Sequence, residues 1–538
     1  MVDWLDPGEI IKRSDRLRAD RALTETHWQE VADYIVPSRE YTTMRTPGEK
    51  RSAVIYHTGP VMAAEQLAGA LHGMLISPAL RWFALRPDDD RLNDGEAKRW
   101  FETATDKMFL MFTSPRRRFD LNAHESLLDV SGFGNGVLFI SDKGMMGPQF
   151  KTLPLQECFL SENDDGNMDT LYRCFKMRAI DVANMPGWDI PSDVRSEAER
   201  TPDNMLECVH AIFPDPKKRV PFVGQYVLKK SKRALGKVER YEEQPFVAAR
   251  WSKRSGESMG FGPGMNALPD VKALNKLEEE HLRGVMLANS PSLAVPDDGF
   301  LSTLNRSPRA LNYYRAEMQG YEDRIFAIPT GERPEIAADK IASMEARVQA
   351  AFYVNWMNLP QRPNMTATEV IQRRDEMLRM MGPMVSRLQT ELLGPVIERC
   401  FNIMWRAGML PPPPQSLQGV GWHVEYSSPL AAAQKSQDAG QALQFIQALS
   451  AVAAGDPSVI DNLDGDEMTA FLADRMGAPA STLRDKEQVQ QLREARQQRE
   501  AQMQQMMAAD AMTKMVGQAG GGINQLAQAA SAGQVQAA

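Results

Sequence analysis

The sequence predicts an α+β protein that is mainly helical. Apolar residues recur at helical spacing through long segments in both halves of the 538-residue chain. Between these segments, residues 137–262 form a block of short strands with turn signals. Helical spacing returns at residue 265, and no internal repeat divides the chain. Strands and helices therefore occupy separate regions, as in α+β folds.

The first region predicts helices around one strand. Residues 8–36 and 60–77 have helical periodicity, and Pro60 suits the first turn of the second helix. The alternation in RWFALRP (81–87) indicates a strand, and helices are expected over 95–113 and 119–130. The apolar face of the first helix consists of Ile10, Leu17, Trp28, Val31, Ala32 and Ile35.

The middle region predicts strands. Its apolar and β-branched runs are GVLFI, ECFL, TLYRCFKMR, ECVHAIF and FVAARW. The run SENDDGNMD (161–169) lies between two of them and contains an Asp-Gly pair. That pair is typical of a hairpin turn, so the flanking strands are expected to pair.

The last region is helical with breaks. Helices are expected over 265–289, from about 338 to 357, and from 367 to about 407, where Gly382-Pro383 and Gly394-Pro395 should kink or break the helix. The four prolines at 411–414 predict a stiff linker. Helices follow over 430–516, and the Gly-, Ala- and Gln-rich tail 517–538 is predicted to be disordered.

Two of these helices flank a compact insertion, 290–339. On a helical wheel, the first helix places its apolar residues on one broad arc and Lys272, Lys276 and Arg283 on the opposite side. A solvated helix face explains these cations as well as a binding surface does. The apolar arc consists of Val271, Leu274, Leu277, Leu282, Val285 and Met286. The return helix has its own stripe of Ile341, Met344, Val348 and Phe352.

A sharply defined loop follows the return helix. Pro360 and Pro363 prevent a regular helix there, and Thr366 and Glu369 have the spacing of a capping box that begins the next helix. The polar side chains of this loop are Gln361, Arg362 and Asn364. A methionine-rich segment follows, and we interpret Met377, Met380, Met381 and Met384 as adaptable core packing.

Composition excludes several classes of protein. The net charge of −8 argues against a general nucleic-acid coat, so any contact with DNA must be local. The cysteines have no CxxC spacing and are expected to be reduced and buried. They are Cys158, Cys174, Cys208 and Cys400. No stretch approaches the ~20 apolar residues of a membrane span, and the N-terminus lacks the apolar core of a signal peptide.

No catalytic, cofactor or metal site is predicted. SGFGNG (131–136) precedes a strand, whereas a dinucleotide fingerprint must open a helix, so a structural turn is favoured. The chain has no GxxxxGK[ST] motif for ATP, and DDGNMD (164–169) lacks the ligand spacing of an EF-hand. The seven histidines are scattered, and His72 on an apolar helix face is interpreted as a satisfied core residue.

Four segments resemble the portal proteins of tailed bacteriophages, above all the head-to-tail connectors of short-tailed phages. They are YHTGPVMAAEQLAGALHGMLISPALRWFALRP (56–87), LLDVSGFGNGVLFI (127–140), MGFGPGMNALPDVKALNKLEE (259–279) and NMTATEVIQRRDE (364–376). Their order also matches the family, and the resemblance covers roughly residues 5–430.

The resemblance implies a ring, usually a dodecamer, at one vertex of the capsid in the virion, assembled in the host cytoplasm. Non-specific double-stranded DNA would pass along its axis, driven by a separate terminase. A tail or adaptor protein would bind later, and major capsid and scaffold proteins would be neighbours. The family is structural rather than enzymatic, and neither a cofactor nor a membrane is implied.

The family architecture divides this chain into named parts. A wing would cover 1–262, a first stem helix 263–289, a clip 290–339 and a second stem helix 340–357. A channel loop would cover 358–366, the long wing helix with its return strand 367–429, a crown 430–516 and the tail 517–538. The loop would contact DNA through Gln361, Arg362 and Asn364, and Lys272, Lys276 and Arg283 would be candidates for the channel wall.

Two further hypotheses remain open. One is a non-channel scaffold or tail-adaptor protein of a phage particle, and the other is an enzyme of the packaging machinery, which the missing P-loop disfavours. For the clip, Asp297 and Asp298 are the expected docking residues. For the crown, 485–516 predicts a helix whose seam residues Val489, Leu492, Met503 and Met506 are interrupted by Arg496 and Arg499.

Overall fold

A computed structural model describes most of the chain in two compact units. The described residues are 4–39, 50, 54–78, 81–88, 95–185, 187–217, 219–296, 305, 307–314, 325–328, 334–357, 379–414, 417, 421–426, 429–453, 463–476, 484 and 488–507. Unit 1 comprises Met1–Leu85, Ala104–Pro411 and Val424–Ala433, and unit 2 comprises Arg86–Thr103, Pro412–His423 and Gln434–Ala538.

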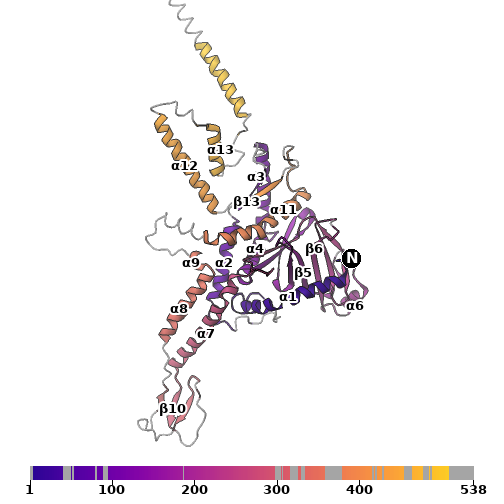
Figure 1. Ribbon diagram of the computed structural model, residues 1–538, viewed down its shortest axis with the longest axis vertical. Coiled ribbons are helices and arrows are strands. Elements are labelled where there is room, and N and C mark those ends of the chain that lie inside the picture. Colours follow the sequence, from indigo (N-terminus) through magenta and orange to yellow (C-terminus); the bar gives the residue numbers. More distant parts are fainter. Residues whose placement is uncertain are drawn as a thin grey trace, which may run out of the picture. The chain divides into compact units, whose positions relative to one another are not determined.

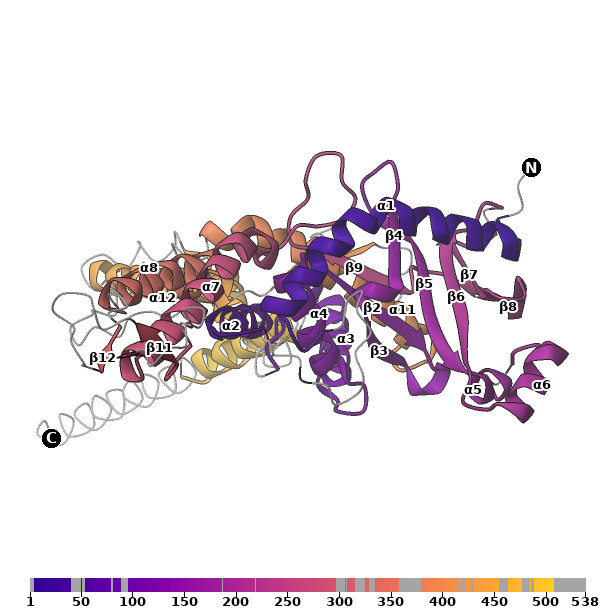
Figure 2. The ribbon, with the colours of Figure 1, turned by 90° about the horizontal axis from the view of Figure 1, so that it is seen from below.

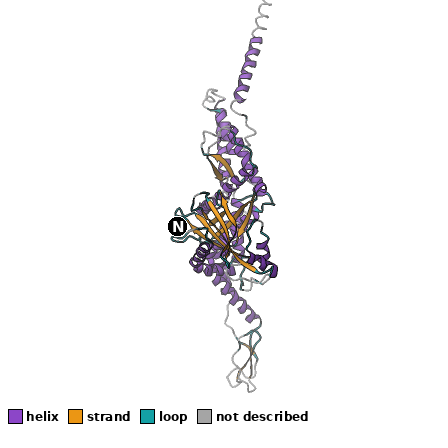
Figure 3. Cartoon of the chain, turned by 90° about the vertical axis from the view of Figure 1, so that its right-hand side faces the viewer, coloured by secondary structure: helices purple, strands orange, loops and turns teal. Residues whose placement is uncertain are grey.

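A five-stranded antiparallel sheet with helices on both faces forms one end of unit 1 (Figure 2). Its order is β4-β5-β6-β7-β8, and the strands lie side by side in Figure 3. The bounds are β4 Cys158–Glu162, β5 Met168–Arg178, β6 Met205–Pro214, β7 Phe222–Leu228 and β8 Arg233–Tyr241. The hairpin predicted at 161–169 is confirmed, because β4 and β5 pair across a turn in which Gly166 has φ +81°.

Helix α1 (Pro7–Tyr34) covers one face of this sheet. Asp6 caps it by accepting the Glu9 N–H at 3.0 Å, and Pro7 stands in the first turn. The helix buries Ile10 and Ile11 against a cluster that includes Val209 and Phe213 of β6. The amphipathic helix predicted over 8–36 is therefore confirmed, and it begins and ends within two residues of the expected positions.

The other face of the sheet is covered by two short helices that the sequence did not predict. These are α5 (Ala179–Ala183) and α6 (Ser192–Arg200). Their apolar residues pack on Leu206 and Cys208, which alternate along β6 with the residues that face α1. The sheet is thus buried on both faces, which explains its many short apolar runs.

A second sheet, β3-β2-β9, lies between the first sheet and the helices α2 and α4. Its strands are β2 Asn135–Asp142, β3 Pro148–Leu153 and β9 Phe246–Arg250. Helices α2 (Gly59–Leu75), α3 (Gly95–Thr113) and α4 (Phe119–Phe133) match the predicted segments closely. Trp82, Phe83, Phe112, Phe119 and Phe150 form an aromatic cluster with ring centroids 4.6–6.3 Å apart.

Within unit 1, helices α7 (Pro263–Asn289) and α8 (Pro334–Ala351) lie side by side and lead to a small sheet (Figure 1). That sheet has the order β11-β10-β12, with β10 Leu293–Pro296, β11 Leu311–Tyr314 and β12 Phe326–Ala327. The chain runs out along α7, crosses the small sheet and returns along α8, as predicted for a helix-flanked insertion.

The prediction of a single return helix over 338–357 is wrong in one respect. The structure breaks it at Phe352 and Tyr353, and a short α9 (Val354–Met357) follows. Tyr353 has φ +60°, a left-handed conformation that cannot continue a right-handed helix. Phe352 is fully buried at this break, so tertiary packing overrides the local helical pattern.

Residues 379–406 are helical throughout, with a π-helical turn at Gln389–Leu393 before α11 (Gly394–Arg406). The break expected at Gly382-Pro383 is wrong, because 379–388 is continuous helix. The disturbance expected at Gly394-Pro395 is confirmed as the π turn, which accommodates the missing N–H of Pro395. Met381 and Met384 are buried as predicted, Met380 is exposed, and Met377 lies outside the described residues.

The remaining elements include the helices of unit 2. The two-stranded sheet β1 (Phe83–Pro87) with β13 (Trp422–Tyr426) confirms the predicted strand. Helices α12 (Pro429–Ala453), α13 (Gly465–Met476) and the helix 488–507 confirm the helical character of 430–516 where it is described. Arg493 Nη1 donates to Asp466 Oδ2 at 2.7 Å, which joins the last helix to α13.

Candidate functional site

Two glycine motifs meet backbone to backbone where α7 begins. Gly134 ends α4 with φ +79°, and a Cβ on it would lie 2.4 Å from the Gly262 nitrogen. A Cβ on Gly264 would lie 2.5 Å from the Gly132 carbonyl oxygen. Only glycine permits this approach, so SGFGNG and GFGPG together form a joint, which we call the glycine joint (131–136 with 259–264). The structural turn predicted for 131–136 is confirmed.

Asn135 fastens the glycine joint. Its side chain is buried, and its Nδ2 donates to the Gly260 carbonyl at 3.0 Å while its Oδ1 accepts the Gly260 N–H at 2.7 Å. The Trp251 N–H donates to the Gly134 carbonyl at 2.9 Å. Both the nitrogen and the oxygen of the buried Asn135 amide therefore have hydrogen-bond partners. These bonds fix the direction in which α7 extends from the glycine joint.

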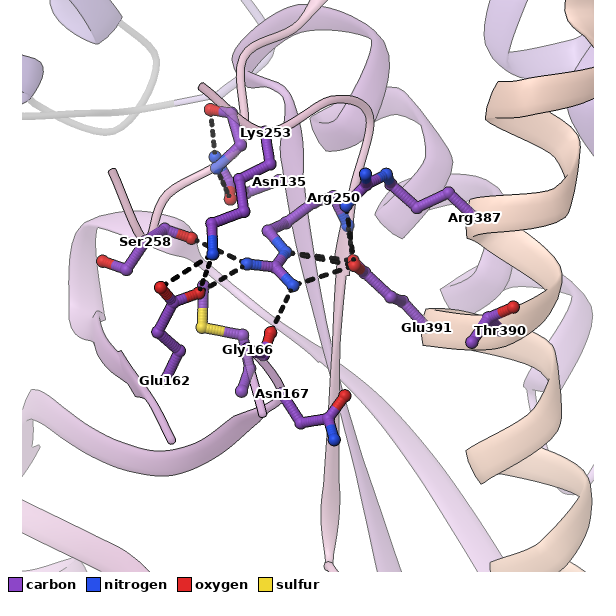
Figure 4. A network of polar contacts seen from close by, with 12 residues as sticks. Asn135, Glu162, Gly166, Asn167, Arg250, Lys253, Ser258, Arg387, Thr390 and Glu391 are labelled. Atoms are coloured by element: carbon purple, nitrogen blue, oxygen red, sulfur yellow. Dashed lines mark hydrogen bonds and ion pairs between the residues drawn. The ribbon is translucent and has the colours of Figure 1, made fainter. Parts of the chain in front are cut away.

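Beside the joint, Arg250 is the centre of a buried polar network (Figure 4). Its Nη2 donates to Glu391 Oε1 at 2.8 Å and to the Gly166 carbonyl at 2.8 Å. Its Nη1 donates to Glu162 Oε2 at 3.0 Å and to the Ser258 carbonyl at 3.1 Å. One side chain thus joins the π turn, the β4–β5 hairpin and the loop that leads into α7.

Two further cations complete this network. Lys253 Nζ donates to both oxygens of Glu162 at 2.8 Å, and Arg387 Nη1 donates to Glu391 Oε1 at 3.1 Å. Burial alone would raise the pKa of Glu162, but hydrogen bonds from Lys253 and Arg250 outweigh it and hold that pKa below its ordinary value. Glu162 and the two cations that contact it are therefore all charged near neutral pH.

The α7–α8 pair, which we call the stem pair, is fastened by a buried stripe and by polar contacts. Ile341, Met344, Val348 and Phe352 are all buried, as the sequence predicted for the return helix. Arg347 Nη2 donates to Asp270 Oδ1 at 2.7 Å across the pair. On α7, the buried Asn275 accepts the Tyr56 N–H at 2.7 Å and donates to the Val54 carbonyl at 2.8 Å, so the segment before α2 is tied to the stem.

The apolar arc of α7 is buried only along its first half. Val271 and Leu274 are buried, but Leu282 is 41% exposed and Met286 is 60% exposed. Large apolar side chains at this exposure on a helix that extends from its unit indicate a surface that another chain can cover.

The three cations predicted on α7 are exposed, but each already contacts carboxylates. Lys272 Nζ lies 2.8 Å from Glu30 Oε1 of α1. Lys276 and Arg283 share Glu279 and Glu280 at distances of 2.6–3.4 Å. Hydrogen bonding from Lys276 holds the pKa of Glu279 below its ordinary value. Exposed pairs of this kind are weak and screened by salt, so the cations can exchange partners.

Several predicted site residues lie outside the described residues. These are the loop residues Gln361, Arg362 and Asn364, the cap residues Thr366 and Glu369, and the clip residues Asp297 and Asp298. The same holds for 508–516 of the crown segment and for the tail 517–538. Other predictions can be placed: His72 is half-buried with Nε2 3.0 Å from Asp120 Oδ1, and three of the four free cysteines are buried while Cys174 is intermediate.

Sequence reasoning missed Arg250, Glu391, Asn135 and Asn275. Three of them lie inside quoted stretches: Asn135 among glycines, Asn275 in an apolar helix and Arg250 near the end of FVAARW. In each case the contrast with the neighbouring residues was an available signal. Arg250 and Glu391 are 141 residues apart, and no local pattern marks their pairing.

The described residues contain no group of three or more His, Cys, Asp or Glu side chains that could hold a metal ion. Among those same residues, no helix combines the length and the apolar character that a membrane span requires.

Comparison with known proteins identifies the family. The sequence model of the bacteriophage head to tail connecting proteins matches residues 7–483. The probable portal protein of Bordetella phage BPP-1 is 28% identical over 92% of this chain and 91% of its own length. The portal protein of Salmonella phage epsilon15 is 27% identical over 90% of each chain. A chain from the neck of a native GTA particle, computed with C12 symmetry, matches 77% of this chain and covers 89% of its own length, with 11% identity and a TM-score of 0.35.

The family match covers most of the chain, including the glycine joint, the buried network and the stem pair. The chain belongs to the family of bacteriophage head to tail connecting proteins. The portal function that the sequence motifs predicted is confirmed by this family match and by the names of both phage relatives.

Proposed function

We propose that copies of this chain form a closed ring, with twelve copies as is usual in the family. In this ring, the stem pairs surround an axial channel for double-stranded DNA. The observation that carries this proposal is the stem pair itself. It extends from a rigid joint, and the second half of α7 exposes Leu282 and Met286. In a ring, the neighbouring copy covers that apolar surface, which a single chain leaves in water.

The parts of the chain then take the roles expected from the family. Residues 1–262 form the wing, 263–289 and 340–357 the stem, 290–339 the clip, 358–366 the channel loop, 367–429 the long wing helix with its return strand, and 430–516 the crown. The protein acts as a structural conduit and docking ring rather than as an enzyme. It stands at one vertex of the capsid in the virion, after assembly in the host cytoplasm.

DNA is held through phosphates without base recognition, since a conduit must let any sequence slide. Arg362, with Gln361 and Asn364, supplies one cation and two neutral donors per copy. Lys272, Lys276 and Arg283 are secondary candidates, because their carboxylate partners Glu30, Glu279 and Glu280 reduce the net charge that DNA meets.

The clip binds the terminase during packaging and a tail or adaptor protein afterwards, with Asp297 and Asp298 as the proposed docking residues. The small sheet β11-β10-β12 supports this proposal, because it gives the insertion a folded base between the two stem helices. Major capsid and scaffold proteins are the expected neighbours of the wing.

Electron microscopy of the purified chain tests the ring. Wild-type protein should form closed rings with an axial hole. The double variant Leu282→Asp/Met286→Asp should lose them, because the charges would be buried between copies. Met205→Asp is the matched control, since Met205 is also exposed (52%) but lies at the start of β6. A wild-type monomer or dimer would instead favour a non-channel scaffold or tail adaptor.

A further inference from the structure

A small apolar pocket opens on unit 1 between the end of α2 and the α3–α4 loop. Its volume is about 250 Å³, and its walls include Ile76, Trp82, Phe112 and Phe119. Leu121 stands on its lining with 64% of its surface exposed. An enclosed apolar space of about 150 Å³ is enough to bind benzene, so this pocket can accept one bulky side chain from another molecule.

The loop beside the pocket carries three consecutive arginines, Arg116, Arg117 and Arg118. Arg116 and Arg118 are exposed, and Arg118 lines the pocket. Within the described chain, no carboxylate lies within ion-pair distance of any of the three. Arg117 Nη1 contacts only a carbonyl, that of Pro148, at 3.3 Å. Asp120, the carboxylate nearest in sequence, lies 3.0 Å from His72 Nε2, but burial lowers the pKa of His72, so Asp120 keeps its charge and offsets one of the three cations.

This loop differs from the basic residues of the stem pair and of the buried network. Lys272, Lys276 and Arg283 of the stem pair all contact carboxylates, and so do Arg250 and Lys253 of the buried network. In a chain with a net charge of −8, three adjacent cations without carboxylate partners form a local positive field.

The start of α4 adds to that field. The helix begins at Phe119, and Arg118 at its N-cap is in the left-handed conformation with φ 57° and provides no side-chain cap. The free N–H groups of the first turn and the helix dipole both favour an anion there, and Asp120 already supplies one carboxylate in that turn. Phe119, Asp120 and Leu121 of that turn also line the pocket, so the apolar and the anion-binding features are adjacent.

The geometry points to a docking site for a short acidic segment of another protein, with one bulky apolar side chain in the pocket and carboxylates on Arg116, Arg118 and the start of α4. We call it the α3–α4 site. Charge complementarity selects acidic partners, and the pocket selects an apolar anchor. Duplex DNA supplies phosphates but no projecting apolar side chain, so the pocket favours a protein segment. The inference does not depend on which residues line the channel.

The test uses full-length protein and fluorescence anisotropy at 150 mM salt. The first probe is a fluorescein-labelled nonapeptide of aspartates and glutamates with one central leucine. The second replaces the leucine by serine, the third replaces the acids by their amides, and the fourth is a labelled 20-base-pair duplex. Only the first peptide should bind well, and we expect each altered peptide to bind at least about tenfold more weakly.

Variants locate the binding to this site. Arg116→Glu/Arg118→Glu and Leu121→Glu should each weaken binding of the first peptide at least about tenfold. Arg195→Glu/Arg200→Glu on α6 is the matched control, because it makes the same charge change at exposed positions that do not line the pocket. All three variants should keep the wild-type melting temperature and oligomeric state, since the changed residues are exposed.

Four outcomes would overturn the proposal. These are no binding of the first peptide at 1 mM, equal binding of the serine peptide, equal loss in the α6 control, and tighter binding of the duplex than of the first peptide. The last result would identify a nucleic-acid surface instead. None of these results alters the ring or its channel, so the proposed portal function is tested separately.

Discussion

Arg250 and Glu391 are joined through both the main chain and the side chain of the arginine. The backbone N–H of Arg250 donates to Glu391 Oε2 at 3.0 Å, and its Nη2 donates to Oε1 at 2.8 Å. The carboxylate therefore fixes both the position of strand β9 and the rotamer of Arg250, the last residue of that strand. This contact ties the helix that follows the 358–378 segment to the base of the stem pair.

Glu391→Ala should destabilise unit 1 by roughly 3 kcal/mol, because it leaves a buried guanidinium without its main partner. Hydrogen–deuterium exchange should rise in 158–168 and 246–262, where the other partners of Arg250 lie. Thr390→Ala is the matched control, since Thr390 is exposed and its hydroxyl donates to the Ser386 backbone carbonyl of the same helix. Equal exchange in the two variants would mean that the network does not hold these segments together.

Gly264→Ala should disrupt the glycine joint, whereas Gly69→Ala should not harm α2. The added Cβ at Gly264 would lie 2.5 Å from the Gly132 carbonyl oxygen. That oxygen is a backbone atom, so it cannot move aside as a flexible side chain could. At Gly69 nothing lies within 4 Å of the added carbon, so the helix should gain about 0.5–1 kcal/mol. Melting temperatures measure both effects, and a fall for Gly69→Ala as large as that for Gly264→Ala would refute the steric argument.

Asp129 should make stability depend on pH. Burial raises the pKa of Asp129 to about 7, although Arg39 with Nε 2.9 Å away opposes the shift. Because the folded pKa is raised, the stabilising contribution is complete below about pH 4 and is lost as pH rises through about 7. Asp129→Asn should therefore gain melting temperature relative to wild type between pH 5 and pH 8.

The control for that experiment is Glu199→Gln on α6, because Glu199 is exposed and is not among the groups that shift the pKa of Asp129. Its melting temperature should follow the wild type across the same range. If Asp129→Asn instead becomes worse relative to wild type as pH rises, the ion pair with Arg39 outweighs the burial of the charge.

Arg362→Glu should form normal rings but impair DNA packaging or retention in an in vitro packaging assay. The physical reason is a reversed charge at each copy of the proposed channel loop, where DNA phosphates would pass. Lys276→Glu, a smaller test of the stem face, should have a weaker effect, because Lys276 is already balanced by Glu279 and Glu280. Wild-type numbers of full heads from Arg362→Glu would remove the loop arginine from DNA handling.

Deletion of 485–538 should leave ring assembly intact. The described part of this segment, helix 488–507, is exposed along almost its whole length and bonds to α13 through Arg493. Its proposed role is a crown around the axis rather than an assembly contact. Loss of all oligomers on this deletion, seen by electron microscopy, would make the segment an assembly element.

Periodicity and turn chemistry predicted most of the fold because they are local signals. The bounds of α3, the β4–β5 hairpin and the buried stripe of α8 all follow from spacing within one element. The helices α5 and α6 were missed because they are short and lie inside a strand-rich block. The break at Tyr353 was missed because its left-handed φ of +60° and the burial of Phe352 beside it leave no mark in the local spacing.

The candidate site was less predictable. The motifs at 131–136 and 259–264 were recognised separately. Their contact depends on the tertiary fold, which no rule of residue spacing predicts. Arg250 is the last residue of an apolar strand and could have been interpreted as an ordinary surface cation. The stem cations were found from the helical wheel, but their neutralisation by Glu30 of α1 depends on the tertiary fold.

The π turn at Gln389–Leu393 holds one residue more than an α-helical turn needs. Removing a single residue there would restore a regular helix, but it would also rotate everything beyond the deletion by about 100° relative to the preceding turns. Arg399 could then no longer donate to the Ile140 carbonyl of β2 while Arg387 and Glu391 kept their places. We therefore expect relatives that keep this helix to tolerate substitutions within the turn far better than a change in its length.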